Sequence, residues 1–370
     1  MKKKPRTTKR AVRPTSRRRL ARPSRPRSRR SRPKIGSAKR RAAPLRPSTG
    51  ERADYAAGMN EGAAWRGNPS AAPENLREAV FEGWRRRFRE PGGGKRTAIW
   101  QRTLRRGRQY AEGFMQGAGM RAAICPIPLR RKAAAVVRAG EDEAALFQTL
   151  SRLEALPLQE IVVVASSPTE RLYAAARGFT NAVVVGLPDS LDPDIGRALG
   201  AKLTAADIIL FADGERPAES EQLARFLWEC DGKLDVVLND LGSRMGTFRR
   251  RGGIERLQEF LNASLRREDL KTNSLSVLPF ALSRQALDAL GASALTVPVK
   301  AHAQAILKGL RIGTGGFVRA ELPANPAGSG WRKTAGDHAE AWSEAIGVRG
   351  SRMHFADSTR KRSLLGEWGT

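Results

Sequence analysis

The segment that decides the fold is Ala206-Asp-Ile-Ile-Leu-Phe-Ala-Asp-Gly-Glu215, an apolar run that ends in two carboxylates separated by one glycine. A continuous apolar run of this length is typical of a strand that is buried on both faces of a sheet. In an open parallel sheet, ligands bind beyond the carboxyl ends of the strands. We therefore expect Asp213 and Glu215 to face a site at that edge, with the glycine allowing the chain to turn.

Patterns typical of strands and helices alternate on both sides of this segment. Apolar runs predict buried strands, and apolar residues three or four positions apart predict helices between them. Strands that alternate with helices of 10 to 15 residues indicate an α/β fold with a parallel sheet built from βαβ units. The expected strands cover residues 133–137, 160–164, 182–185, 207–211 and 235–238, and the expected helices cover 143–156, 168–178, 194–204 and 219–230.

The formal net charge of +30 is unevenly distributed along the 370 residues. Residues 1–48 contain 21 Lys or Arg and no acid, residues 51–132 contain 17 against 8 acids, and residues 133–370 contain 29 of each sign. Residues 1–48 have almost no large apolar side chains, so we expect a disordered basic arm. The excess of Lys and Arg in residues 1–132 favours salt-dependent binding of a polyanion, such as nucleic acid or a wall polymer, by this part of the chain.

Cysteine usage and hydropathy limit the class of protein. The two cysteines, Cys125 and Cys230, are too few for a disulfide framework or a cysteine-based zinc site. No apolar run follows the basic N-terminus as in a secretory signal, and no stretch approaches the length of a membrane span. These features predict a cytoplasmic protein without a transmembrane segment, and leave open that the arm docks it on an anionic surface.

A short pattern occurs twice between residues 49 and 125. Tyr55-Ala-Ala-Gly58 with Gly62 and Tyr110-Ala-Glu-Gly113 with Gly117 place paired glycines one helical turn apart, where another backbone could approach closely. The favoured interpretation is small helical hairpins whose aromatic side chains bury against one another; stacking of these aromatics on nucleic-acid bases is the alternative. The aromatics are Trp65, Trp84, Phe88, Trp100 and Phe114.

The two carboxylates of the deciding segment suggest metal chemistry. Mg²⁺ and Mn²⁺ take oxygen ligands and are often shared with the phosphates of a substrate. Such a cation would neutralise the charge that develops on a diphosphate leaving group. The alternative is an acidic turn with two solvated side chains, since strand ends are commonly acidic.

Four segments together resemble family 2 glycosyltransferases of the GT-A fold, in order and spacing over about 100 residues. The resemblance implies a nucleotide-diphosphate sugar as donor, an acceptor that it does not identify, and Mn²⁺ or Mg²⁺ as cofactor. The chain differs from the family in having Arg138 where proline is usual, Ser166 and Ser167 where aspartates are usual, and Glu215 at the end of the acidic motif. The segments are Val136-Val-Arg-Ala-Gly-Glu-Asp-Glu143, Ile161-Val-Val-Val-Ala-Ser-Ser167, Gly196-Arg-Ala-Leu-Gly-Ala-Lys202 and Phe211-Ala-Asp-Gly-Glu215.

The resemblance also implies roles for single residues. Ala139, Glu141 and Asp142 would line the nucleotide pocket, with Ser166 near the base and ribose and Arg197 as a further donor contact. Asp213 and Glu215 would hold the metal, and His338 would complete its ligands; the alternative for His338 is a surface histidine behind a helix cap at Asp337. Asp240 is a candidate general base for an acceptor hydroxyl, and capping of the following loop is its alternative.

These inferences divide the chain into residues 1–48 as the arm, 49–130 as a basic helical segment, 131–320 as the glycosyltransferase-like α/β domain, and 321–370 as a helical extension. The expected function is metal-dependent transfer of a sugar from a nucleotide-diphosphate donor. The competing expectation is a non-catalytic relative whose basic arm binds nucleic acid or another polyanion.

Overall fold

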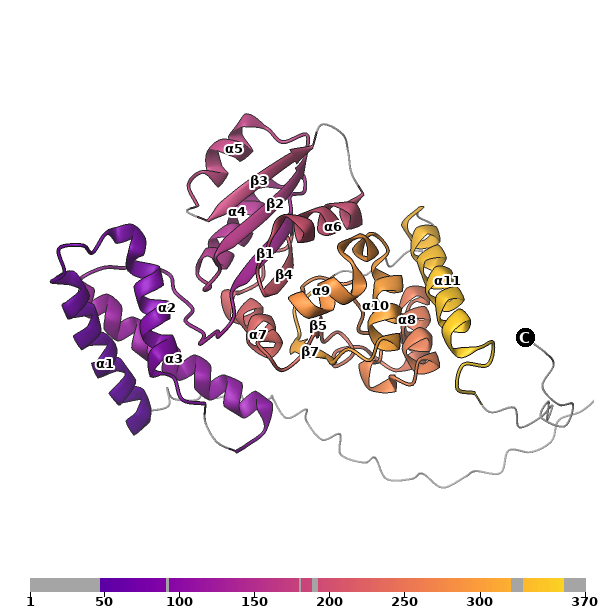
Figure 1. Ribbon diagram of the computed structural model, residues 1–370, viewed down its shortest axis with the longest axis horizontal. Helices are drawn as coiled ribbons and strands as arrows, with labels where there is room; N and C mark the ends of the chain where they lie inside the picture. Colours follow the sequence, from indigo (N-terminus) through magenta and orange to yellow (C-terminus); the bar gives the residue numbers. More distant parts are fainter. Residues whose placement is uncertain (1–46, 91–92, 180, 188–191, 321–328, 356–370) are drawn as a thin grey trace, which may run out of the picture. The chain divides into compact units, whose positions relative to one another are not determined.

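The computed structural model describes residues 47–90, 93–179, 181–187, 192–320 and 329–355 (Figure 1). The chain divides into two units, residues 1–46 and 47–370. The disordered arm expected for residues 1–48 lies outside the described residues, apart from its last two.

A seven-stranded mixed sheet organises the α/β part of the chain, with strand order β3-β2-β1-β4-β6-β5-β7. All neighbouring strands pair in parallel except β6, which is antiparallel to both β4 and β5. This confirms the expected α/β class with a mostly parallel sheet. The strands are β1 Ala133–Arg138, β2 Glu160–Ser166, β3 Ala182–Leu187, β4 Ile208–Asp213, β5 Val236–Asn239, β6 Phe280–Ser283 and β7 Ile312–Gly316.

The helices expected between the first five strands are all present. They are α4 Glu143–Glu154, α5 Glu170–Ala176, α6 Pro193–Leu203 and α7 Ser220–Cys230. The later helices are α8 Gly253–Ser264, α9 Arg284–Leu290, α10 Pro298–Leu307 and α11 Ser329–Arg349, with short 3-10 turns that include Phe248–Arg250. No helix within the described ranges is long and apolar enough to cross a membrane.

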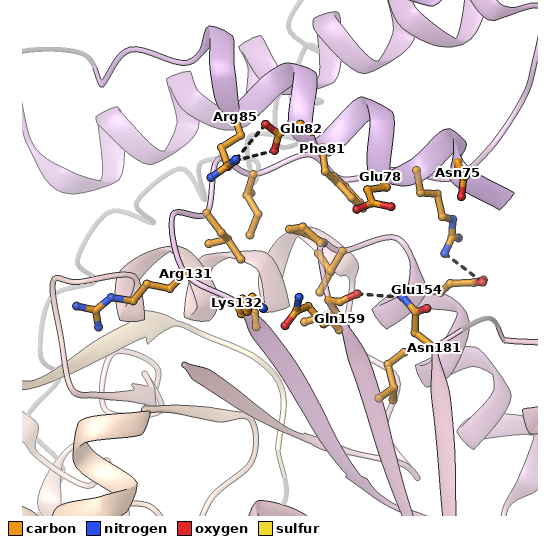
Figure 2. Close-up of a pocket in the computed structure, with 18 of the residues that line it drawn as sticks. Asn75, Glu78, Phe81, Glu82, Arg85, Arg131, Lys132, Glu154, Gln159 and Asn181 are labelled. Carbon is orange, nitrogen blue, oxygen red and sulfur yellow. Dashed lines mark hydrogen bonds and ion pairs between the residues drawn. The ribbon is translucent and has the colours of Figure 1, made fainter. Parts of the chain in front are cut away.

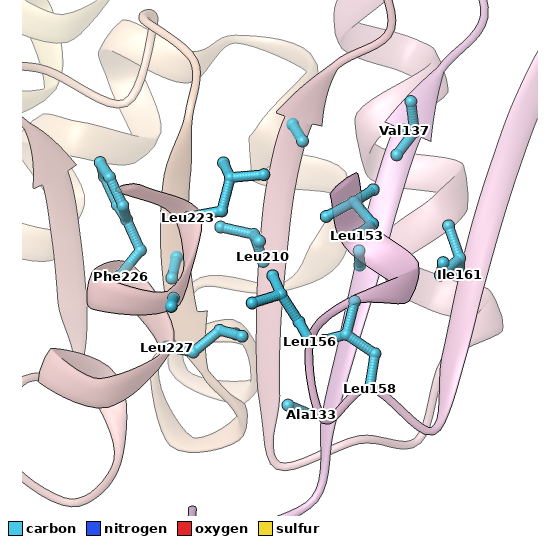
Figure 3. Packing of buried hydrophobic residues seen from close by; sticks show 14 of the residues in the cluster. Ala133, Val137, Leu153, Leu156, Leu158, Ile161, Leu210, Leu223, Phe226 and Leu227 are labelled. Atoms are coloured by element: carbon cyan, nitrogen blue, oxygen red, sulfur yellow. The ribbon is translucent and has the colours of Figure 1, made fainter. Parts of the chain in front are cut away.

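Two apolar cores lie on the two faces of the sheet, because alternate strand residues point to opposite sides. One core joins Ala133 and Val137 of β1 to Leu153 of α4 and Leu227 of α7 (Figure 3). The other joins Val136 of β1 to side chains of α6, α8, α10 and α11. Each strand of the sheet centre is therefore buried on both faces, which explains its continuous apolar sequence.

Three helices precede the sheet: α1 Thr49–Arg66, α2 Leu76–Arg87 and α3 Arg96–Ala118. The repeated glycines lie where α1 and α3 touch. A Cβ atom on Gly58 would lie 2.1 Å from the carbonyl oxygen of Tyr110, and one on Gly113 would lie 2.1 Å from that of Tyr55. The two copies of the pattern thus pack against each other, each glycine admitting the backbone of the other copy.

Most aromatic side chains of this region bury against one another, as the favoured interpretation expected. Trp84 contacts Phe88 and Tyr110, and Trp65 contacts Phe114. Trp100 differs, because it packs on Trp228 of α7 with ring centroids 5.4 Å apart and so belongs to the core of the α/β part. Beside it, Arg96 of α3 reaches the buried carboxylate of Glu229 at 2.5 Å.

Candidate functional site

The strand order places a topological switch point between β1 and β4. From β1 the chain proceeds to β2 and β3 on one side and then returns to β4 on the other side of β1. Crevices outside the carboxyl ends of such strands are the usual ligand sites of open α/β sheets. The residues at these ends are Arg138 of β1 and Asp213 of β4, which are paired in register.

Two glycines let the loops after β1 and β4 approach closely. A Cβ atom on Gly214 would lie 2.2 Å from the carbonyl oxygen of Arg138, and one on Gly140 would lie 1.9 Å from Oε1 of Glu215. Both distances are far below van der Waals contact, so neither position accepts a side chain without movement. At this edge, the sequence predicted a role for Gly214 but none for Gly140.

Asp213 and Glu215 are both held by backbone amides of this edge. The amide of Glu215 donates to Oδ1 of Asp213 at 2.9 Å, and the amide of Glu141 donates to Oε1 of Glu215 at 3.3 Å. Their side chains remain 29% and 40% exposed. The carboxylates are thus positioned but still accessible to a ligand from solvent.

Arginines surround the two carboxylates. Nη2 of Arg138 lies 3.6 Å from Oε2 of Glu215, and Nε of Arg216 lies 3.8 Å from Oδ2 of Asp213. Arg197 of α6 pairs with Asp194 at 2.8 Å; burial lowers its pKa, opposed by the attraction of Asp194 and Asp213. The edge therefore combines two carboxylates with three cations that could meet phosphate oxygens.

The two carboxylates can hold a divalent cation only if a bound substrate and water supply its other ligands. Within the described ranges, no three His, Cys, Asp or Glu side chains gather as metal ligands. Mg²⁺ is commonly held by one or two carboxylates, with substrate phosphates and water completing its shell. Asp213 and Glu215 match that arrangement as a pair.

His338 does not join the two carboxylates, in contrast to the expected three-ligand set. It is fully buried in α11, where Nδ1 lies 2.7 Å from the carbonyl oxygen of Thr334 and its ring faces Trp342. It is not a surface histidine either. Its helical position four residues after Thr334 and its packing against α10 account for its burial.

The other residues expected at the nucleotide lie at or next to the same edge. Ala139 is buried and donates its amide to the carbonyl of Val164 at 2.9 Å, which extends the pairing of β1 with β2. Asp142 caps α4 by accepting from the amide of Ala145 at 3.1 Å. Ser166 ends β2 and is exposed.

Asp240 follows β5, which runs parallel to β4 because both are antiparallel to β6. Its Oδ1 accepts from the amide of Ser243 at 3.3 Å and from Nδ2 of Asn273 at 3.4 Å. The side chain thus caps the turn that follows β5. Asp240 nevertheless lies at the same sheet edge as Asp213.

Arg138 and Arg216 belong to this site but were not predicted, although the strand-end position that indicated Asp213 also applies to them. Arg138 ends a strand of the same sheet, and Arg216 follows the acidic pair directly. Arg319 lies nearby as well, since it lines, with Asp213 and Arg216, a small cavity of about 10 Å³. The position of Arg138 at the end of a predicted strand was enough to assign it to the site.

A larger cavity of about 680 Å³ lies at the opposite edge of the sheet (Figure 2). Lys132 and Gln159, which precede β1 and β2, line it together with Phe81 and Glu78 of α2. Its carboxylates are partly neutralised, because Arg85 binds Glu82 and Arg77 binds Glu154. The amino ends of parallel strands are not the usual ligand side, so this cavity is separate from the carboxylate pair.

No protein-family model matches the chain, and no curated protein matches it. Several solved structures are similar. Glucosyl-3-phosphoglycerate synthase from Mycobacterium tuberculosis, in complex with Mn²⁺, uridine diphosphate and phosphoglyceric acid, is 18% identical, with 62% of this chain and 81% of that chain covered and a TM-score of 0.42. A mannosyltransferase from Pyrobaculum calidifontis, in complex with GDP-mannose and Mn²⁺, is 16% identical, with 74% and 75% covered and a TM-score of 0.40.

Proposed function

We propose that this chain is a glycosyltransferase that transfers a sugar from a nucleotide-diphosphate donor to an acceptor hydroxyl. The observation that carries the proposal is the position of Asp213, Glu215 and Arg138 at the topological switch point of the sheet. Open α/β sheets bind their ligands at that point. Paired carboxylates beside arginines suit a ligand that combines phosphates with a divalent cation.

The donor diphosphate would lie between the carboxylate pair and the arginines. Mn²⁺ or Mg²⁺, when bound by Asp213 and Glu215, would neutralise charge on the diphosphate leaving group. Arg138, Arg197 and Arg216 would contact phosphate oxygens, for which a guanidinium offers paired donors. The nucleoside would extend over Ala139, Glu141 and Ser166, at the ends of β1 and β2.

Asp240 is the proposed general base on the acceptor side. Hydrogen bonds from Ser243 and Asn273 to Oδ1 fix the orientation of the carboxylate. Oδ2 would then be the oxygen that takes the proton of the acceptor hydroxyl. A general base of this kind typically contributes about 10² to 10⁴ in rate.

The test is calorimetric titration of UDP-glucose or GDP-mannose, with Mn²⁺ and with chelator, into the wild type and Asp213→Asn. The substitution removes one charge and keeps the shape, so the fold should survive. We expect donor affinity to fall about tenfold or more, because a direct ligand contributes at least as much as the outer-shell partners of a metal. Asp288→Asn, at an exposed aspartate of α9, is the matched control.

Two results would contradict the proposal. One is equal donor affinity in the wild type and Asp213→Asn. The other is a wild type that binds none of a panel of nucleotide-diphosphate sugars, with or without metal, in which case a non-catalytic relative is the better description.

A further inference from the structure

A continuous exposed surface with aromatic side chains lies on α8, α11 and the turn before α8. Phe248 and Phe260 are 55% and 54% exposed. The guanidinium of Arg256 lies 5.5 Å from the ring centroid of Phe248, and Arg256 and Phe260 are one helical turn apart on α8. Phe260 meets Trp342 of α11 edge to face at 5.4 Å. We call these four residues and Ile346, one turn after Trp342 and 41% exposed, the α8/α11 surface.

The charge around the α8/α11 surface is positive. Arg249, Arg250 and Arg256 are exposed, and none of them forms an ion pair within the described part of the chain. The nearby acids are occupied elsewhere: Glu259 binds Arg251, and Glu255 accepts from the amide of Gly252. With Arg251, these arginines outnumber the two acids of residues 248–260, Glu255 and Glu259, so the segment beside the aromatic rings keeps a positive net charge.

We propose that the α8/α11 surface docks on an anionic lipid bilayer. Exposed aromatic side chains with arginines on the same helix face are the composition of elements that lie in a membrane interface. The rings would enter the headgroup region, and each arginine would add about fivefold to binding through anionic lipid. The surface lies on faces of helices rather than in a groove, which suits a flat lipid surface better than a peptide.

A local probe separates this surface from the basic N-terminal residues, which would also attract the chain to anionic vesicles. Phe260→Cys labelled with an NBD dye reports water exclusion at that position. The native thiols will not compete, because both are buried, and burial raises the pKa of Cys125 to about 12 and also raises that of Cys230. Val183→Cys, at an exposed position of β3, is the matched control label.

We expect a blue shift and an increase of NBD emission at residue 260 with vesicles of phosphatidylcholine and phosphatidylglycerol. Phosphatidylcholine alone should give no such change, nor should the label at residue 183. In the unlabelled full chain, the double substitution Phe248→Ser and Phe260→Ser should weaken vesicle binding at least about tenfold. The reason is that the variant loses the favourable transfer of two half-exposed aromatic rings from water into the membrane. Met59→Ser with Val183→Thr, which alters two exposed apolar residues elsewhere, should not.

Three results would overturn the proposal. These are no spectral change at residue 260, equal changes at residues 260 and 183, and an equal change at 260 when single-stranded RNA replaces the vesicles. The last result would indicate base stacking on the aromatic rings instead.

Discussion

Arg138 and Asp213 end neighbouring parallel strands at the same register position, which places a cation beside the carboxylate pair of the candidate site. The guanidinium of Arg138 leans toward Glu215, with Nη2 3.6 Å from Oε2. A bound divalent cation would have to share Glu215 with this arginine. If the proposed function holds, Arg138 would compete with the metal when the donor is absent and would turn to the diphosphate when the donor is bound.

Arg138→Gln should strengthen the binding of Mn²⁺ alone and weaken the binding of the donor. An exposed ion pair of this kind is worth about 0.2 to 1 kcal/mol, so its loss should tighten Mn²⁺ binding by at most about fivefold. Titration of Mn²⁺ into the nucleotide-free protein, followed by titration of the donor, measures both effects. Arg152→Gln, in a surface pair with Glu219, is the control. Weaker Mn²⁺ binding in Arg138→Gln would show that the two cations do not compete.

Gly140→Ala should displace the carboxylate of Glu215. The new Cβ would lie 1.9 Å from Oε1, and because Oε1 belongs to a flexible side chain, Glu215 should rotate away while the fold persists. We expect metal-dependent donor affinity to fall about tenfold, as for the loss of a well-placed ligand. Gly347→Ala on α11 is the control, since its Cβ would meet no atom within 4 Å. Equal donor affinity in both variants would contradict the assigned role of Glu215.

The strands and helices from residue 133 to residue 239 could be predicted from the sequence because each strand is a short apolar run between amphipathic helices. The antiparallel strand β6, Phe280–Ser283, gave no such pattern, since it is only four residues long, follows an irregular turn and leads directly into α9. Its pairing with β4 and β5 is set by long-range contacts that periodicity does not report. The expectation of a parallel sheet was therefore correct for all strands except this one.

The candidate site could be predicted in part for the same reason. Asp213 and Glu215 follow directly from a strand pattern, and the position of a strand end fixes the sheet edge to which they belong. His338 could not be placed, because its burial depends on the packing of α11 against α10. Sequence distance gave no indication of that contact.

Gly113→Ala should destabilise the helices that precede the sheet. Its Cβ would lie 2.1 Å from the backbone oxygen of Tyr55, and two helix backbones would have to separate. We expect a loss of about 3 kcal/mol in the free energy of unfolding, at the upper end of overpacking costs. Gly336→Ala on α11, whose Cβ would meet no atom within 4 Å, should instead gain about 1 kcal/mol. Denaturant unfolding of both variants decides, and equal stabilities would contradict the close helix contact.

The buried His302 should make the protein less stable in mild acid. Asn262 donates its amide to two carbonyls, so its Oδ1 accepts from Nε2 of His302 at 2.8 Å, which places the ring proton on Nε2. Burial, with smaller effects of Arg267 and His338, lowers the pKa of His302 from 6.5 to about 3. The unfolded chain therefore binds the proton first, and stability that is complete above pH 6.5 falls as the pH drops toward 3.

His302→Gln isolates this effect, because the glutamine amide can still donate to Asn262 but does not titrate. Between pH 7.5 and 5.5 the wild type should lose about 1.4 kcal/mol more unfolding free energy than the variant does, the value of one pH unit of proton linkage. His338, whose pKa is also lowered by burial, adds a loss of the same sign to both proteins and cancels in the difference. Urea unfolding of both proteins at the two pH values measures this difference, and the stability of the variant at pH 7.5 gives the packing cost of the substitution separately. Parallel stability curves for the two proteins would mean that His302 gains its proton without opening the contact between α8 and α10.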